Sequence, residues 1–267
     1  MPASSSPFTT IVLAADRGHP DPVARAAGAS CKAMTPVGGT PMIVRVLEAL
    51  RAARSVASII VCGPPRAVID QDKHLQQILA SSRLEWLPSG PSPSTSAAAA
   101  LQTLSADTPV LLTTADHALL TPAMVDHFCS QACLASADAV VALAVHEAIM
   151  KAYPGMRRTA TRFQDGPFCG CNLFAILNAR GRRAVEFWRQ VEAERKRPWK
   201  MIQKLGWLVV FRYLSGRLTL TEGLRRASDL IGIEAAAVLM PFPEAAVDVD
   251  TPDDWSFVEN LVRHSGG

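Results

Sequence analysis

Charged side chains that can act together on a phosphate ester lie far apart in this 267-residue sequence. Lys32 is near the amino end, Asp116 is near the middle, and Asp248 and Asp250 are near the carboxyl end. A lysine ammonium is a compact positive charge suited to phosphate oxygens. Carboxylate oxygens are ligands that Mg²⁺ prefers, often together with substrate phosphates. These residue types favour Mg²⁺-assisted chemistry on a polyphosphate, provided that the fold brings them together.

Lys32 follows a predicted strand and precedes a predicted helix. The apolar run Ile11-Val12-Leu13 ends in small residues, the loop contains Gly18 and Gly28, and a periodic helix begins near Pro41. Strand, loop and helix in this order place a ligand at the carboxyl edge of a parallel sheet. Small residues there let a nucleotide approach the backbone. We therefore predict a phosphate-bearing ligand at this loop.

Asp116 comes just after the apolar run Val110-Leu111-Leu112, which is typical of a buried central strand. A carboxylate at that strand end suits a Mg²⁺ ion that bridges phosphates. A helix-capping aspartate is the structural alternative, but Thr121 and Pro122 already supply the cap and first residue of the next helix. The position favours a metal ligand, and we expect His117 to shape the turn.

The third group is predicted on a strand at residues 246–249. A period of two places Asp248 and Asp250 on the same face, so that one or both can complete an oxygen-only Mg²⁺ site with Asp116. Thr251 is then the N-cap of the last helix.

These motifs resemble those of the MobA-like nucleotidyltransferases, relatives of the molybdenum-cofactor guanylyltransferase. The resemblance is carried by Leu13-Ala14-Ala15, by the run from Thr35 to Met42, by the run from Asp116 to Pro122 and by the run from Val247 to Trp255. Asp16 stands where the family usually has a glycine, and the loop to Lys32 is longer than usual. A carboxylate beside a triphosphate needs a metal or an arginine such as Arg17 to balance it.

The resemblance implies roles for specific residues. Lys32 and Asp116 would be catalytic, and Asp116 with Asp248 and Asp250 would hold Mg²⁺. The implied nucleotide-binding residues are Leu13, Ala14, Ala15, Asp16, Arg17, Gly18, Lys32, Gly90 and Ser96. A plain proline-serine linker is an equally good interpretation of the loop with Gly90 and Ser96.

Strand and helix patterns alternate along the chain, and 49% of its residues are hydrophobic. This alternation predicts an α/β fold with a doubly wound, mostly parallel sheet. The resemblance makes it Rossmann-like, of the nucleotide-diphospho-sugar transferase (GT-A) type. We expect a disordered N-terminus over residues 1–7 and a single domain over 8–267, within which residues 146–245 form an α+β insert or subdomain on the acceptor side.

Residues 146–245 also contain the acceptor-binding candidates. Asn172 interrupts an apolar strand and therefore needs a polar partner. The other candidates are Arg162, Arg195 and Arg197, although a run of cations is more often a solvated surface. The apolar helix expected over 201–214 can be core, a dimer surface or a surface that rests on a bilayer, and core is the interpretation that we favour.

The composition of the chain argues against some classes of binding partner. A formal net charge of +3 without an aromatic-interleaved basic stripe argues against nucleic acid. No apolar run is long enough for a transmembrane helix, which leaves peripheral membrane contact as the remaining route to a bilayer. The six cysteines do not suggest a disulfide framework in so long a chain. We expect a cytoplasmic monomer or homodimer.

The predicted function is transfer of a nucleoside monophosphate from a nucleoside triphosphate, with CTP favoured, to a phosphorylated small molecule, with release of pyrophosphate. A phosphate acceptor is itself nucleophilic and needs only positioning and charge neutralisation for in-line attack. One alternative is a GT-A-type glycosyltransferase, but Thr114-Ala115-Asp116 has one aspartate where an Asp-x-Asp pair is expected. The other is a non-catalytic nucleotide-binding or sensing protein, which Asp16 would suit.

Overall fold

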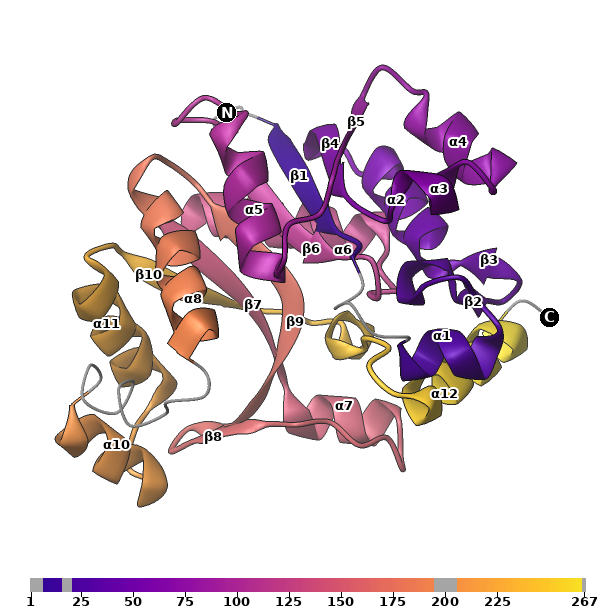
Figure 1. The fold of residues 1–267 in the computed structure, drawn as a ribbon. Coiled ribbons are helices and arrows are strands. Elements are labelled where there is room, and N and C mark those ends of the chain that lie inside the picture. Colours follow the sequence, from indigo (N-terminus) through magenta and orange to yellow (C-terminus); the bar gives the residue numbers. More distant parts are fainter. Residues whose placement is uncertain (1–6, 16–20, 195–205, 266–267) are drawn as a thin grey trace.

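A mixed sheet forms the centre of the protein, which we describe from a computed structural model for residues 7–15, 21–194 and 206–265 (Figure 1). The strand order is β10-β7-β9-β6-β1-β4-β5, and β8 pairs with β9 alone. The strands are β1 (Phe8–Leu13), β4 (Val56–Cys62), β5 (Leu84–Leu87), β6 (Val110–Thr114), β7 (Ala139–Val145), β8 (Thr161–Phe163), β9 (Gly166–Ile176) and β10 (Ala235–Leu239). A separate small hairpin consists of β2 (Pro36–Val37) and β3 (Thr40–Pro41).

Most neighbouring strands of the central sheet run parallel. The pairs β1 with β4, β1 with β6, β4 with β5, and β7 with β10 are all parallel. Strand β9 runs antiparallel to β6, β7 and β8. The predicted doubly wound, mostly parallel sheet is confirmed.

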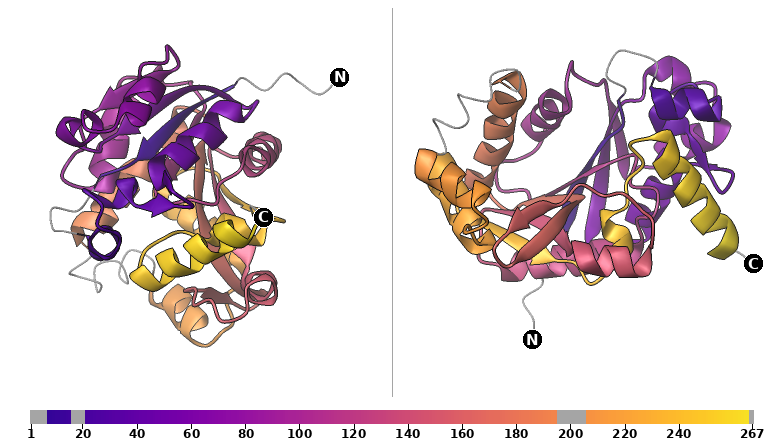
Figure 2. Two further views of the ribbon diagram at one scale, coloured as in Figure 1. Left: turned by 90° about the vertical axis from the view of Figure 1, so that its right-hand side faces the viewer. Right: turned by 90° about the horizontal axis from the view of Figure 1, so that it is seen from below.

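Helices cover both faces of the sheet (Figures 1 and 2). The α-helices are α1 (Pro22–Ala27), α2 (Met42–Ala52), α3 (Arg66–Ile69), α4 (Lys73–Leu79), α5 (Pro93–Gln102), α6 (Pro122–Leu134), α7 (His146–Ala152), α8 (Arg183–Glu194), α10 (Trp207–Leu214), α11 (Leu220–Ile231) and α12 (Pro252–Ser265). Short 3-10 helices are η1 (Lys32–Met34), η2 (Arg180–Arg182) and η3 (Pro243–Ala246).

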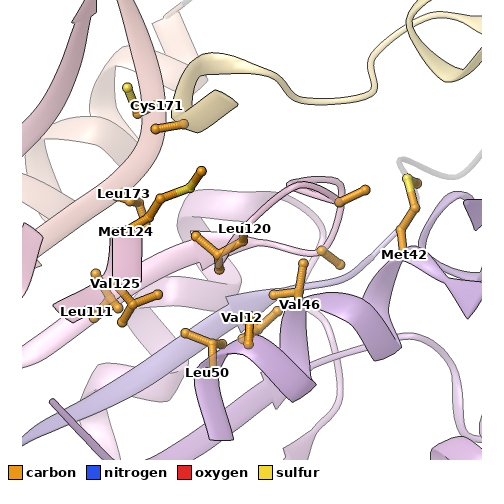
Figure 3. Packing of buried hydrophobic residues seen from close by; sticks show 14 of the residues in the cluster. Val12, Met42, Val46, Leu50, Leu111, Leu120, Met124, Val125, Cys171 and Leu173 are labelled. Carbon is orange, nitrogen blue, oxygen red and sulfur yellow. The ribbon is translucent and has the colours of Figure 1, made fainter. Parts of the chain in front are cut away.

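Alternate strand residues supply the two core layers, because successive side chains of a strand point to opposite faces. Val12 and Leu111 pack on the side of α2 and α6, against residues such as Val46 and Met124 (Figure 3). Ile11, next to Val12, faces the other layer, where α5 and α8 lie. Complete burial of each such aliphatic side chain contributes roughly 1.5–3 kcal/mol. The same packing fixes the strand ends that carry the site.

Residues 66–79 form two helices, α3 and α4, because the Asp72 side chain accepts from Leu75 N and caps a new helix. One segment that was expected to be a strand is different. The strand predicted over 246–249 does not form. Residues 243–246 are instead η3, and the extended residues that follow bond to the end of β6 through a single Val249 N to Asp116 O contact of 3.1 Å.

The apolar helix expected in the core lies on the surface, so the core interpretation is wrong. No residue of α10 is buried, and residues 201–205 of the predicted helix lie outside the described residues. The next helix, α11, begins with a capping box between Thr219 and Glu222.

Residues 146–245 contribute to the central sheet as well as to its surroundings. Strand β9 lies between β6 and β7, β8 pairs with β9, and β10 forms one edge of the sheet, whereas the helices α7 and α10 lie outside the sheet (Figure 1). Over the described ranges, no helix has both the length and the apolar character needed to cross a membrane.

Candidate active site

Three side chains from distant parts of the chain meet at the carboxyl edge of β1 and β6. Lys32 Nζ lies 2.6 Å from Asp116 Oδ2 and 2.9 Å from Asp250 Oδ1. The Lys32 and Asp116 side chains are 19% and 16% exposed, while that of Asp250 is 63% exposed. The structure thus brings together the lysine and two of the carboxylates that the sequence singled out.

Backbone hydrogen bonds fix Asp116 at the end of β6. Ala115 N donates to Leu13 O at 2.9 Å, which extends the pairing of β6 with β1 past the last strand residue. The Thr114 hydroxyl donates to Asp116 Oδ1 at 2.5 Å, so that the other carboxylate oxygen, Oδ2, faces Lys32. The Asp116 carboxylate therefore has a defined orientation.

Lys32 begins η1, after a loop that the small helix α1 shortens. Asp21 caps α1 by accepting from Val23 N and Ala24 N, and Gly28 ends it with a φ of 66°, in the left-handed region. Residues 16–20 of this loop, with the predicted Asp16, Arg17 and Gly18, lie outside the described residues.

Asp250 is held by the start of α12. The Asp254 carboxylate accepts from Asp250 N at 3.3 Å, from Thr251 N at 2.8 Å and from the Thr251 hydroxyl at 2.7 Å. Trp255 Nε1 donates to Pro36 O at 2.7 Å, which ties α12 to the hairpin that follows Lys32. The helix that positions Asp250 is thereby attached to the lysine loop.

Opposing effects act on the Lys32 ammonium. Burial lowers the pKa of Lys32, but attraction and hydrogen bonds from Asp116 and then Asp250 outweigh this and raise that pKa above its ordinary value. Lys32 therefore stays charged at neutral pH and balances two carboxylates.

Asp248 faces a different set of partners. Its carboxylate forms an ion pair with Arg158, and Asn172 Nδ2 donates to Asp248 Oδ2 at 2.6 Å. Asn172 adopts a φ of 49°, a left-handed conformation that asparagine tolerates better than most residues. Burial raises the pKa of Asp248, although Arg158 opposes the shift. Asp248 therefore does not join Asp116 and Asp250 around Lys32.

The donor atoms at Lys32 suit a divalent cation. Two carboxylates already converge on one positive group, and Mg²⁺ is commonly held by one or two carboxylates plus substrate phosphates. Across the described parts of the chain, no group of three His, Cys, Asp or Glu side chains is arranged to hold a metal ion. The residues fit a two-carboxylate site at Asp116 and Asp250, and the three-aspartate arrangement is not formed.

A hollow beside β1 gathers most of the described residues that were predicted to bind nucleotide. Leu13, Ala14 and Ala15 line it together with Gly90 and Ser96. Cys62 and residues 91–93 complete its lining. Gly90 N donates to Ser96 Oγ at 2.9 Å, and that hydroxyl in turn donates to Ser92 O at 3.0 Å. The loop is therefore folded back on itself at the start of α5, and it is not an unstructured linker.

A larger cleft of about 750 Å³ adjoins this loop and is lined by residues 91–95 and by α8. Glu192 of α8 accepts from the Ser94 hydroxyl and from Ser94 N, the latter at 3.3 Å. Residues 146–245 thus provide one wall of the cleft.

Two of the four predicted acceptor-binding residues belong to the part of the chain that the structure describes. Arg162 is exposed on β8, and Asn172 is bonded to Asp248. Arg195 and Arg197 lie outside the described residues.

Sequence reasoning missed three residues that organise the site. Thr114 orients Asp116, Arg158 balances Asp248, and Glu192 contacts the start of α5. Thr114 could have been found from its place at a strand end, two residues before Asp116. Nothing in the local sequence marks the partners of Arg158 or Glu192, because both come from distant segments.

Comparison with solved structures places this fold and site among known proteins. A hypothetical transferase from Thermus thermophilus is 31% identical, with a TM-score of 0.76, over 93% of this chain and 99% of that one. A CMP:2-keto-3-deoxy-manno-octonic acid synthetase solved with CTP has a TM-score of 0.57 at 14% identity, over 97% of this chain and 99% of that one, which supports a common fold alone.

The class is therefore that of α/β transferase folds. The model of the MobA-like NTP transferase domain family matches residues 10–204, and the chain belongs to that family. It is also 41% identical, over 68 residues, to a 2-C-methyl-D-erythritol 4-phosphate cytidylyltransferase of Frankia casuarinae. That match spans 26% of this chain and 24% of the relative. Family membership supports a nucleotidyl-transferring enzyme.

Proposed function

We propose that this protein transfers CMP from CTP to a phosphorylated small molecule and releases pyrophosphate. The observation that carries the proposal is the meeting of Lys32 with Asp116 and Asp250 at the carboxyl edge of the sheet, beside the hollow formed by β1 and the loop before α5. Ligands of open α/β sheets bind at this edge.

In the proposed reaction, a phosphate oxygen of the acceptor attacks the α-phosphorus of CTP. The bond from that phosphorus to the bridging oxygen breaks, and pyrophosphate leaves with the electron pair. Lys32 donates hydrogen bonds to phosphate oxygens and neutralises the charge that moves onto the leaving group. The acceptor is the nucleophile, so that no side chain needs to form a covalent intermediate.

Asp116 and Asp250 would hold Mg²⁺, which when bound supplies charge neutralisation and alignment of the phosphate oxygens. The Thr114 hydroxyl keeps the Asp116 carboxylate in place. Asp248, with Arg158 and Asn172, supports the wall of the site and leaves the cation to the other two aspartates.

The preference for CTP rests on the relatives. The curated relative with 41% identity over part of the chain is a cytidylyltransferase, and one protein of the same fold was solved with CTP. The hollow is bounded by small residues, among them Ala14, Gly90 and Ser96, which let a nucleotide approach the backbone.

The test is pyrophosphate release from each of the four ribonucleoside triphosphates across a panel of sugar, alditol and sugar-acid phosphates. We expect release with CTP that depends on both Mg²⁺ and one acceptor class, and that is lost in Asp116→Asn. Release with GTP alone would overturn the choice of nucleotide. Release of a nucleoside diphosphate from a nucleotide sugar, with none of pyrophosphate, would indicate a glycosyltransferase and would overturn the proposal as a whole.

A further inference from the structure

Helix α10 has one face docked on the protein and one apolar face in solvent. Tyr213 on the docked side makes an edge contact with Phe163 of β8, with ring centroids 6.1 Å apart. Arg212 donates to both carboxylate oxygens of Glu222 at 2.6 and 2.7 Å, which fixes α10 to α11. The helix is therefore held in place by contacts that do not use its outer face.

The outer face is a stripe of large apolar side chains. Trp207, Leu208, Phe211 and Leu214 are 70%, 72%, 64% and 77% exposed. Their spacing of one, three and three residues places them within one side of an α-helix. We call these four residues the α10 stripe. Contiguous exposed apolar surface of this kind is typical of an interaction site.

Positive charge accompanies the stripe. Residues 206–226 contain four arginines and one acidic residue, Glu222, which pairs with Arg212. The Arg226 guanidinium lies beside the start of α10, since a Cβ built on Gly206 would be 3.5 Å from its Nη2 atom. Arg217 is exposed just past the end of α10. In the sequence, residues 195–205 add five cations and no acid.

These features favour a lipid surface over a second copy of the chain as the partner of the α10 stripe. A positively charged helix that presents tryptophan, phenylalanine and leucine on one side matches helices that lie in a bilayer interface. At about 100–200 Å² for each large side chain, the four residues of the α10 stripe offer roughly 400–800 Å² of apolar surface. A stable protein interface needs about 800 Å² from each partner. Two copies that met through this net-positive surface would also repel each other.

We propose that α10 is a membrane-docking element that rests the protein on an anionic lipid bilayer. The α10 stripe inserts into the headgroup region, and the flanking arginines lie at the level of the lipid phosphates. Helix α10 lies beside α11 and β8, at the periphery of the molecule and away from α1 and α12 (Figure 1). Docking through α10 therefore leaves the carboxyl edge of β1 and β6 accessible to substrates.

The test is co-sedimentation of the full chain with vesicles. Wild type is compared with the triple variant Trp207→Ala, Phe211→Ala, Leu214→Ala, and with the control Leu134→Ala, which removes a leucine that is 72% exposed on α6. One set of vesicles is phosphatidylcholine alone, and the other also contains phosphatidylglycerol. We expect wild type and Leu134→Ala to sediment with the anionic vesicles, less so at high salt, because salt screens the arginines. The triple variant should bind roughly tenfold or more weakly.

Equal sedimentation of the triple variant and wild type would overturn the proposal, as would equal binding to neutral and anionic vesicles. Light scattering of the same proteins gives a further readout. A wild-type dimer that the triple variant converts to a monomer, with no binding to either vesicle, would show that the α10 stripe contacts a second copy instead. Because the altered residues lie outside the site around Lys32, nucleotidyl transfer to a soluble acceptor should not change, and failure of one proposal does not imply failure of the other.

Discussion

Lys32 contacts both carboxylates that would hold Mg²⁺ in the proposed reaction. Its ammonium balances the charges of Asp116 and Asp250 and holds the two side chains close together. Two carboxylates that share a site repel each other when the positive group is removed. The same lysine would have to turn from the carboxylates to the phosphates when a metal-nucleotide complex binds. Because of this double role, replacing Lys32 should change metal affinity as well as the rate of transfer. Replacing a lysine that only binds phosphate should change the rate alone.

Lys32→Met should lower the rate of pyrophosphate release by roughly 10²–10³, the usual cost of losing one charge-stabilising donor. It should also raise the affinity for Mn²⁺ in the absence of nucleotide, because the two carboxylates then lack their positive partner. The first effect is read from kcat and the second from electron paramagnetic resonance of free Mn²⁺. The exposed Lys73→Met on α4 is the matched control and should change neither quantity. Unchanged Mn²⁺ affinity in Lys32→Met would show that Lys32 and the metal ion do not compete for the two carboxylates.

Arg158 and Asp248 form a pair whose side chains are only 12% and 13% exposed. Removing one member of such a pair leaves a charge buried without its partner, at a typical cost of 3–5 kcal/mol. Arg158→Leu should therefore lower the free energy of unfolding by about 3–5 kcal/mol in urea titration. The double variant Arg158→Leu, Asp248→Asn removes both buried charges and should cost clearly less. Similar losses in the two variants would show that Arg158 acts through packing and not through charge.

At this scale, position relative to strand ends and helix caps pointed to three residues that the structure places in contact. Lys32, Asp116 and Asp250 each follow an apolar segment or precede a capped helix, and that pattern can be read locally. Asp248 differs from Asp250 only by the partners that the fold gives it, namely Arg158 and Asn172. The choice between two aspartates two residues apart therefore needed coordinates.

Among the elements, the turn after β4 and the end of β1 approach each other closely. Gly63 has a φ of 79°, and a Cβ there would lie 3.3 Å from the backbone carbonyl of Ala14. Gly63 N also donates to Leu87 O at 2.9 Å, so the turn joins β4 to β5. Ala14 lines the hollow, and the shape of that hollow therefore depends on a residue that does not line it.

Gly63→Ala should destabilise the protein by about 1–2 kcal/mol, the cost of a side chain in the left-handed region. It should also raise KM for the nucleoside triphosphate, because the added carbon pushes against the Ala14 backbone. Gly155→Ala is the matched control, since Gly155 has a φ of 89° but nothing within 4 Å of an added Cβ. The control should lose similar stability in urea titration with KM unchanged. An unchanged KM in Gly63→Ala would show that this turn does not affect nucleotide binding.

Most regular elements followed from hydrophobic periodicity, and the exceptions have a common cause. The apolar runs Ile11-Val12-Leu13 and Val110-Leu111-Leu112 were expected to be strands, and they lie in β1 and β6. Residues 246–249 alternate like a strand but find no neighbouring strand to pair with beyond one bond to Asp116 O. Helix α10 is apolar enough for the core, yet the sheet faces are already filled by other helices. Tertiary context, which local patterns do not contain, decided both cases.

For the whole molecule, the fold places a titratable group in the core next to the site. His117 follows Asp116 directly and is 1% exposed. Burial lowers the pKa of His117 from 6.5 to about 4, although the Asp116 carboxylate attracts the proton. The folded protein therefore keeps this imidazole neutral over a range in which the unfolded chain protonates it.

Stability should consequently be complete above about pH 6.5 and should fall as the pH drops toward 4, since only the unfolded state then gains the His117 proton. Between pH 7 and pH 4.5 the loss from this one group amounts to about 2–3 kcal/mol, at about 1.4 kcal/mol for each pKa unit. Urea titration of wild type and His117→Gln at pH 7 and at pH 4.5 isolates the contribution of His117 to the free energy of unfolding, because the carboxylates contribute equally in both proteins. The pH-dependent loss should be smaller by about 2–3 kcal/mol in His117→Gln than in wild type. Equal losses in wild type and His117→Gln would mean that His117 is protonated as readily in the folded protein as in the unfolded chain.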